Sequence, residues 1–360
     1  MNDLSMRKPY VWVWIAVLLL AFYLRLAGLF ANTFHADEAL FASWARHIAV
    51  WKDPLLLTQP VDKPPLLFYV QAIFFPLQGP VEWAARLPNF IASLLTVPLT
   101  AVFFQRLYKT EIKDYTDSTD SSPQLPSSSS LHLPLIITVL IITCSPIAIQ
   151  FSSTAFTDPL LTFWLVASLT LTCNLQLATC NKKPPIWAGI FFGLALATKY
   201  QAWLFLPLIL GVGWLQGWHW RDFLRFIIGV LPVLITVVLW EWVRTGTFSL
   251  WSTQISNFGG VRVAWSWEIA PRLLQWWYLW QTAVPLTLLF LFLLIVVGLF
   301  VRVWFVDDEN GRFDLLLILF LLSYFLFHWL LAIPVWDRYL LPLIPIVVVL
   351  FGRAVMIVGG

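Results

Sequence analysis

Two adjacent carboxylates follow the first long apolar run of the sequence. They are Asp37 and Glu38, in the stretch FHADEALFASWARH at residues 34–47. Two neighbouring carboxylates in a partly dry site can act as a general base and an orienting group, or can hold a metal ion. The alternative is that both only cap a helix, because negative charges stabilise helix N-termini. Aromatic residues recur at helical spacing after them and predict an amphipathic helix over 38–51.

A lysine and an aspartate stand before a rigid turn a little further along the chain. The stretch VDKPPLLFYV, residues 61–70, places Asp62 and Lys63 ahead of Pro64 and Pro65. The two prolines restrict the backbone and so fix the direction of the ammonium group. At headgroup height such an ammonium suits the phosphate of a lipid. The alternative is a lysine that only anchors the chain at the interface, with its charged end in water.

Other charged residues stand at the ends of apolar segments. Asp158 opens one segment in STAFTDPLLTFWLV, and Lys199 separates two in TKYQAW. Asp337 and Arg338 precede the last segment in WDRYLLPLIP. The structural alternatives are a helix cap for Asp158, a helix end for Lys199, and for the last two an ion pair of little energetic weight. His35, taken alone, is more typical of a structural residue than of a ligand.

A tryptophan-rich stretch carries two more candidate residues. Residues 243–275 contain Arg262 and Arg272 among several tryptophans. Aromatic rings of this kind can stack on sugars and form the wall of a substrate cavity. The alternative is a belt of tryptophans at the membrane interface, where these amphipathic rings are enriched.

The composition identifies the elements that must position these residues. The chain has 360 residues, 60% of them hydrophobic and 11% charged, whereas soluble domains carry about 25% charged residues. Apolar runs near 20 residues long recur and predict an all-α, polytopic membrane protein with about ten transmembrane helices, in a range of nine to twelve. The predicted segments are 10–30, 86–107, 131–150, 157–178, 185–198, 200–217, 222–242, 276–300, 313–333 and 338–357. Segment 66–79 is shorter and Pro-flanked, which predicts a second helix at the interface beside 38–51.

Lysine and arginine in short loops give the orientation. They place the N-terminus in the cytoplasm, behind an uncleaved first span, and put 31–85 and 243–275 outside as loops of one transmembrane domain, 1–360. The Ser/Pro-rich stretch 109–130 is expected to be a disordered cytoplasmic loop. The candidate charges then fall at one non-cytoplasmic face. The net charge of +3 shows no basic face for nucleic acid, and the three cysteines form no CxxC pair.

Six motifs in order resemble a known family of membrane enzymes. They are ADEALFASWAR, VDKPPLLFYVQAIF, GPVEWAARLPNFIASLLT, AFTDPLLTFWLV, GLALATKYQAWLFLPL and DRYLLPLIP. Together they resemble the membrane domain of GT-C glycosyltransferases, specifically the protein O-mannosyltransferase and aminoarabinose transferase group (glycosyltransferase family 39-like). The resemblance runs from about residue 10 to 350.

The resemblance implies an inverting transfer of a sugar from a polyprenyl-phosphate carrier to an acceptor protein, lipid or glycan on the outer face. It puts the catalytic acidic pair on Asp37 and Glu38. It puts contact with the carrier phosphate on Lys63, and the arginine of the last motif on Arg338. Asp158 would face the cavity. Arg338 and Lys199 are further candidates for binding the phosphate of the donor.

The resemblance leaves the cofactor open, and a divalent metal ion is the one candidate. Its potential ligands are Asp37, Asp62, Asp158 and His35. Asp62 stands where the family often has glutamate, which puts metal ligation by that residue in doubt. The family tyrosine four residues after the catalytic aspartate is Phe41 here, and the usual glycine after Thr-Lys is Tyr200.

Two other functions fit parts of the sequence. A transporter or flippase of a lipid-linked sugar would need ionisable residues in the middle of several spans, whereas here the mid-span positions are almost wholly apolar. A non-catalytic assembly subunit would use the charges only for capping and anchoring. The N-terminal residues and the lack of a glycosylation sequon favour a bacterial inner membrane.

Overall fold

The computed structural model describes most of the chain, and within that part the protein is helical. The described residues are 3–30, 33–76, 82–108, 132–173, 184–248, 252–253, 256, 261–283, 286–305 and 309–359. The helices are α1 (Asp3–Leu29), α2 (Ala36–Ala49), α3 (Leu66–Phe74), α4 (Glu82–Leu107), α5 (His132–Cys144), α6 (Pro146–Ser152), α7 (Asp158–Thr172), α8 (Pro184–Thr198), η2 (Tyr200–Phe205), α9 (Leu206–Leu215), α10 (Trp220–Thr245), α12 (Ser266–Ala283), α13 (Leu286–Phe305), α14 (Glu309–Leu330), η4 (Asp337–Leu343) and α15 (Ile344–Gly359). A single isolated β-bridge, between Val263 and Leu331, interrupts this pattern in the described part. The predicted all-α class is confirmed. The predicted loop 109–130 lies outside the described residues.

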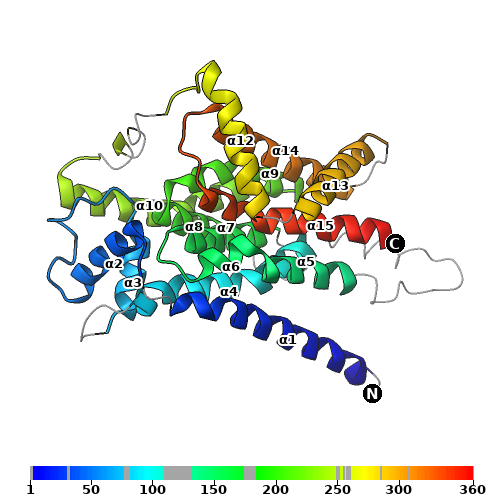
Figure 1. Cartoon of the computed structure of the whole chain (residues 1–360), viewed down its shortest axis with the longest axis horizontal. Coiled ribbons are helices and arrows are strands. Elements are labelled where there is room, and N and C mark those ends of the chain that lie inside the picture. The colour runs from blue at the N-terminus through cyan, green and yellow to red at the C-terminus, as the bar shows by residue number, and fades with distance from the viewer. Residues whose placement is uncertain are drawn as a thin grey trace, which may run out of the picture.

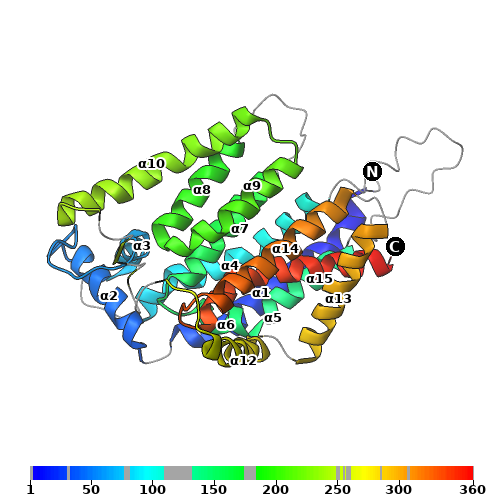
Figure 2. The ribbon, with the colours of Figure 1, turned by 90° about the horizontal axis from the view of Figure 1, so that it is seen from above.

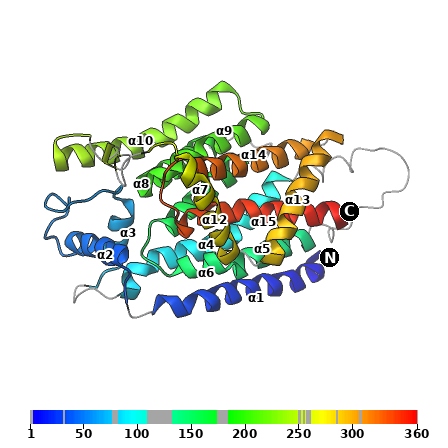
Figure 3. The ribbon, with the colours of Figure 1, turned by 45° about the horizontal axis from the view of Figure 1, so that its top comes forward.

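Most of the long helices run along one axis of the molecule. The two termini lie at one end, and α2 and α3 lie at the other (Figures 1 and 2). α1 and α10 lie on opposite sides of the bundle (Figure 3), and both are largely exposed, whereas α15 is mostly buried. Exposed apolar helices around a buried one are what a lipid solvent requires, so the chain is an integral membrane protein.

The helices only partly confirm the predicted span count. Within the described residues, five are long and apolar enough to cross a membrane, and α5 with α6 makes a sixth if that pair, bent by 53°, is one span. Four shorter apolar helices lie in the other predicted segments. The prediction of one span over 276–300 is wrong, because α12 ends at Ala283 and α13 begins at Leu286. Pro285 stands between them in the sequence, and residues 284 and 285 lie outside the described part. Figure 2 shows α12 nearly end-on and α13 from the side.

The helix α2 begins where the sequence supplies a capping box. The His35 side chain accepts the backbone N–H of Asp37, and the Glu38 carboxylate accepts that of His35 at 2.9 Å. This reciprocal arrangement satisfies two donors that the first turn leaves unpaired. On its inner face Trp44 contacts Phe68 of α3, with ring centroids 4.9 Å apart. The two predicted interfacial helices therefore pack against each other, although residues 77–79 of the second lie outside the described part.

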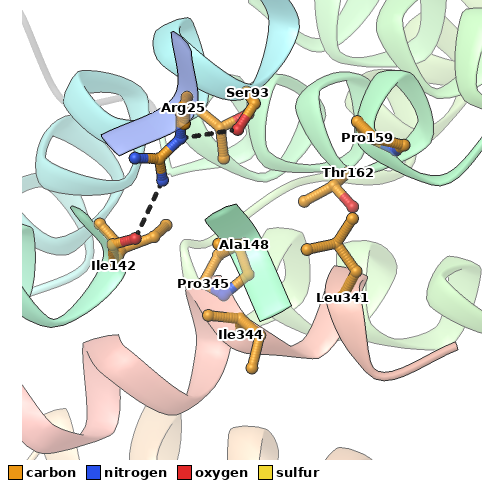
Figure 4. A pocket seen from close by; sticks show the side chains of 10 residues that line it. Arg25, Ser93, Ile142, Ala148, Pro159, Thr162, Leu341, Ile344 and Pro345 are labelled. Carbon is orange, nitrogen blue, oxygen red and sulfur yellow. Dashed lines mark hydrogen bonds between the residues drawn. The ribbon is translucent and has the colours of Figure 1, made fainter. Parts of the chain in front are cut away.

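A buried arginine stabilises the bend between α5 and α6. Pro146 has no N–H to offer the Ile142 carbonyl, and Arg25 of α1 donates to that oxygen at 3.2 Å and to the Thr143 carbonyl at 3.1 Å. It also donates to the Ser93 hydroxyl at 3.0 Å (Figure 4). An arginine inside a span costs about 2.5–3.5 kcal/mol on insertion scales, and these neutral acceptors offset part of that cost.

Glycines allow two helices to approach closely. A Cβ at Gly189 of α8 would overlap the carbonyl oxygen of Phe226 in α10, and a Cβ at Gly229 of α10 would overlap that of Ile186. Small residues at helix contacts let backbones meet in membrane proteins, where dispersion replaces the hydrophobic effect. The pair α8–α10 therefore depends on these two positions.

A buried polar cluster joins three helices near the C-terminal end of α4. The Tyr108 hydroxyl donates to Asp314 of α14 at 2.7 Å, and Arg353 of α15 donates to the same carboxylate at 3.2 Å. All three side chains are almost completely buried. We call these three residues the Tyr108 cluster.

Candidate active site

Asp37 pairs with an arginine from the far end of the chain. Arg338 Nη1 donates to Asp37 Oδ2 at 3.0 Å, across 301 residues of sequence. The Asp37 side chain is 42% exposed, so a second molecule can reach its carboxylate. The guanidinium of Arg338 lies over the rings of Phe156 and Trp336, at 4.8 and 5.3 Å. Within the described chain its Nε–H is buried without a hydrogen-bond partner, whereas the side chain as a whole is 19% exposed.

Glu38, the neighbour of Asp37, lies in a different environment. Its side chain is 5% exposed and pairs with Arg86 of α4 at 3.3 Å. It also accepts the backbone N–H of Ala155 at 2.7 Å, besides that of His35. These bonds tie the start of α2 to α4 and to the segment before α7. Among the described contacts Glu38 is thus engaged in fixing the backbone next to Asp37.

Asp158 and Lys199 form a buried ion pair. Lys199 Nζ donates to Asp158 Oδ1 at 2.6 Å, and Asp158 is 1% exposed at the start of α7. Lys199 stands at the break between α8 and η2, with its ammonium 4.6 Å from the centroid of the Tyr339 ring. A buried pair of this kind is retained only where its geometry is good, because desolvation is costly.

The electrostatics of Lys199 connect the three candidate phosphate ligands. The pKa of Lys199 is lowered to about 8, chiefly by burial. The Asp158 carboxylate opposes this shift, and the charges of Arg338 and Lys63 contribute to it. Contacts therefore link the Asp158–Lys199 pair to the Arg338–Asp37 pair through Tyr339, which follows Arg338 directly. Lys63 is connected to them through the effect of its charge on Lys199.

The loop that carries Lys63 is held from α10. Lys63 Nζ pairs with Asp62 at 2.6 Å, and both side chains are partly exposed. Arg244, near the end of α10, donates to the carbonyls of Gln59 and Val61 at 3.1 and 3.0 Å. These two bonds fix the backbone just ahead of Asp62. Sequence reasoning missed Arg244, because nothing near it in the chain indicates its partners.

The two arginines of the tryptophan-rich stretch have other partners. Arg262 is exposed and pairs with Glu268 through two bonds of 2.7 Å. Arg272 donates to four backbone carbonyls at and after the end of α14, those of His328, Trp329, Leu331 and Ile333. Cations are favoured at helix C-termini. Their predicted role in lining a substrate cavity stays a prediction.

Three acidic metal candidates each face a cation. Asp37 pairs with Arg338, Asp62 with Lys63, and Asp158 with Lys199. Among the described residues, no three His, Cys, Asp or Glu side chains gather as a metal site. In the described part of the chain these acidic donors are engaged with cations, binding of a divalent ion stays a prediction, and the chemistry below uses only the side chains of the chain.

A small cavity lies next to this site, deeper in the bundle. Figure 4 shows Arg25, Thr162 and Leu341 on its walls; Thr162 follows Asp158 by one helical turn. It has room for about one water molecule, far less than a sugar or a lipid chain requires. This cavity is therefore not a substrate pocket, and the group of the candidate site that a second molecule can reach is the Asp37 carboxylate.

The fold matches solved membrane proteins, although no protein-family model and no curated protein matches the sequence. The apo structure of ArnT from Cupriavidus metallidurans is 19% identical, with a TM-score of 0.62 over 97% of this chain and 60% of that one. ArnT bound to undecaprenyl phosphate is 18% identical, with a TM-score of 0.65 over 96% and 60%. The chain has the GT-C fold.

A second GT-C protein matches less closely. The oligosaccharyltransferase of Archaeoglobus fulgidus, in complex with zinc and sulfate, is 12% identical, with a TM-score of 0.52 over 95% of this chain and 48% of that one. This chain spans about 60% of the length of ArnT and about half that of the oligosaccharyltransferase. The GT-C resemblance inferred from six motifs is confirmed at the level of the fold.

Proposed function

We propose that this chain is a glycosyltransferase that takes a sugar from a polyprenyl-phosphate carrier and passes it, with inversion, to an acceptor on the non-cytoplasmic face of a bacterial inner membrane. The observation that carries the proposal is the placement of Arg338 on the accessible carboxylate of Asp37, with Lys199 against the ring of the next residue, Tyr339. The charge of Lys63 acts on Lys199 from the neighbouring loop. Three cations suit a lipid phosphate, and an exposed carboxylate suits an acceptor hydroxyl. ArnT, with the same fold, binds undecaprenyl phosphate.

The reaction assigns a separate task to each charge. The acceptor hydroxyl gives its proton to Asp37, and its oxygen forms a bond to the anomeric carbon on the side opposite the phosphate. The bond from that carbon to the phosphate oxygen breaks, and the electron pair leaves with the polyprenyl phosphate. Fixed cations at the developing negative charge supply the largest share of such catalysis. Lys63, Lys199 and Arg338 are those cations.

The Asp37–Arg338 pair links the two halves of this reaction. Arg338 holds the Asp37 carboxylate at 3.0 Å, and the exposed part of its side chain brings a positive charge to the place where the phosphate would bind. The base and the leaving group are thereby kept at a fixed separation. Glu38 acts behind Asp37: its bonds to Arg86 and to the Ala155 N–H hold the first turn of α2 in place.

The first prediction concerns Asp37. Asp37→Asn should fold and insert normally but lose transfer by about 10²–10⁴-fold, the usual contribution of a general base. Purified protein is incubated with a panel of polyprenyl-phosphate sugars and acceptors, and mass spectrometry measures the released carrier. Size-exclusion chromatography in detergent checks the fold.

Asp222→Asn is the matched control, because Asp222 pairs with Arg225 at 2.6 Å near the start of α10. Its transfer rate should equal that of the wild type. Near-normal transfer by Asp37→Asn would remove Asp37 from the role of base. Movement of the lipid-linked sugar across liposomes without any acceptor, together with an inactive transfer assay, would favour a flippase instead.

A further inference from the structure

One buried tyrosine joins the two irregular segments that carry two of the cations. Tyr324 lies in α14 and is 4% exposed. Its hydroxyl accepts a hydrogen bond from the Gln201 side-chain amide of η2. The same hydroxyl donates to the Tyr339 carbonyl of η4 at 2.9 Å. A single side chain thus contacts both segments.

The partners of Tyr324 stand next to the candidate phosphate ligands. Gln201 follows Lys199 by two residues, and Tyr339 follows Arg338 directly. The Lys199 ammonium also lies 4.6 Å from the centroid of the Tyr339 ring. Any shift of η2 against η4 therefore changes the distance between Lys199 and Arg338.

The backbone alone does not fix this distance. Lys199 has extended φ and ψ at the break between α8 and η2, and Arg338 lies in a short 3-10 helix that follows an irregular stretch. Short 3-10 segments have poorer hydrogen-bond geometry than α-helices. Tyr324, by contrast, lies in a regular helix, with its ring stacked on His328 at 4.2 Å and packed against Phe205 at 5.7 Å.

We propose that Tyr324 is a positioning residue that sets the spacing of Lys199 and Arg338 for the phosphate of the lipid donor. This rests on the proposed function and deepens it, because it names a group outside the site on which phosphate binding depends. Tyr324 acts through its hydroxyl and touches no substrate. Removal of the Tyr324 hydroxyl should weaken phosphate binding, whereas removal of an equally buried hydroxyl elsewhere should lower only the stability of the fold.

The experiment measures binding of undecaprenyl phosphate to the purified full chain in detergent. Tyr324→Phe removes only the hydroxyl. Tyr108→Phe is the matched control, since it removes an equally buried hydroxyl from the Tyr108 cluster, which contains none of the phosphate ligands. We expect Tyr324→Phe to raise the Kd by at least about fivefold and Tyr108→Phe to leave it unchanged, with similar losses of Tm.

A double-variant comparison separates positioning from general loosening. In an Arg338→Gln background one of the two spaced cations is already gone, so adding Tyr324→Phe should change the Kd by less than twofold. Equal effects of Tyr324→Phe and Tyr108→Phe, or full additivity with Arg338→Gln, would overturn the inference alone. A wild type that fails to bind undecaprenyl phosphate would instead overturn the proposed function.

Discussion

Asp37 and Glu38 are neighbours in the chain, yet their carboxylates meet different surroundings. Successive side chains on an α-helix point about 100° apart, so at the start of α2 one faces Arg86 and the other faces Arg338. The sequence indicates an acidic pair but cannot say which member is buried. That choice depends on Arg86 and Arg338, which lie 48 and 301 residues away.

The ionisation of Lys199 gives a prediction for pH. Its folded-state pKa, about 8, is below its ordinary value chiefly because burial disfavours the charged form. The ammonium is therefore present below pH 8 and is lost as the pH rises through 8. A phosphodiester donor keeps its charge over this range, so we expect the donor KM to rise above about pH 8 in steady-state assays.

Lys199→Arg is the comparison variant for this profile. A guanidinium stays charged at every accessible pH, so its donor KM should stay flat through pH 9 even if its absolute value is higher. An identical alkaline rise in both proteins would assign the titration to another group. If the acceptor KM of the wild type rises over the same pH range as its donor KM, the titration likewise belongs to a group other than Lys199.

Which site residues the sequence reveals depends on how far away their partners are. Four charged residues stand beside apolar segments: Lys63, Asp158, Lys199 and Arg338. A charged side chain in a membrane costs free energy, so its presence there indicates a functional role. Tyr324, like Arg86 and Arg244, acts through partners elsewhere in the fold. The sequence predicts the charges at the site, and the structure adds the residues that position them.

At the scale of elements, apolar runs predict helices well and their interruptions less well. The capping box at His35 and the prolines before α3 mark real helix starts. The apolar composition of 276–300 predicts one span, whereas the structure has α12 up to Ala283 and α13 from Leu286. A proline inside an apolar run is ambiguous, since α4 contains Pro88 and Pro98 and continues through both.

The prediction at the scale of elements concerns the contact between α8 and α10 and its effect on stability. Gly229→Ala places a methyl group against the Ile186 carbonyl, so the two backbones must separate. We expect a loss of about 1–3 kcal/mol, the usual range for overpacking, seen as a lower Tm in detergent. Donor binding should fall as well, because Lys199 follows α8 and Arg244 lies on α10.

Gly298→Ala in α13 is the matched control, because a Cβ there meets nothing within 4 Å. Alanine favours a helix over glycine, so this variant should be at least as stable as the wild type. Equal Tm losses at the two positions would show that the close approach of α8 and α10 does not limit stability.

At the scale of the whole molecule, the two ends of the helix bundle carry different segments of the chain. One end has α2, α3 and the Lys63 loop, and the other has both chain termini (Figure 2). The proposed reaction requires the first end to face away from the cytoplasm. Positive charges near the N-terminus favour that orientation.

Cysteine labelling tests the orientation directly. In a background without the three native cysteines, Trp51→Cys lies in the loop after α2 and Arg221→Cys lies at the start of α10; both positions are exposed. We expect a membrane-impermeant maleimide to label position 51 in spheroplasts and position 221 only after lysis. The reverse pattern would place the candidate site in the cytoplasm and contradict the proposed side of transfer.

The hydrogen bonds of Arg25 have a consequence for biosynthesis. Its acceptors Ser93, Ile142 and Thr143 are all made later than α1. While the ribosome is still translating, the first helix enters the translocon with its guanidinium bonded only to the Ala21 carbonyl of the same helix. An arginine at the centre of a span costs about 2.5–3.5 kcal/mol, so the apolar remainder of α1 must supply the free energy of insertion until α4 and the bend after α5 are made.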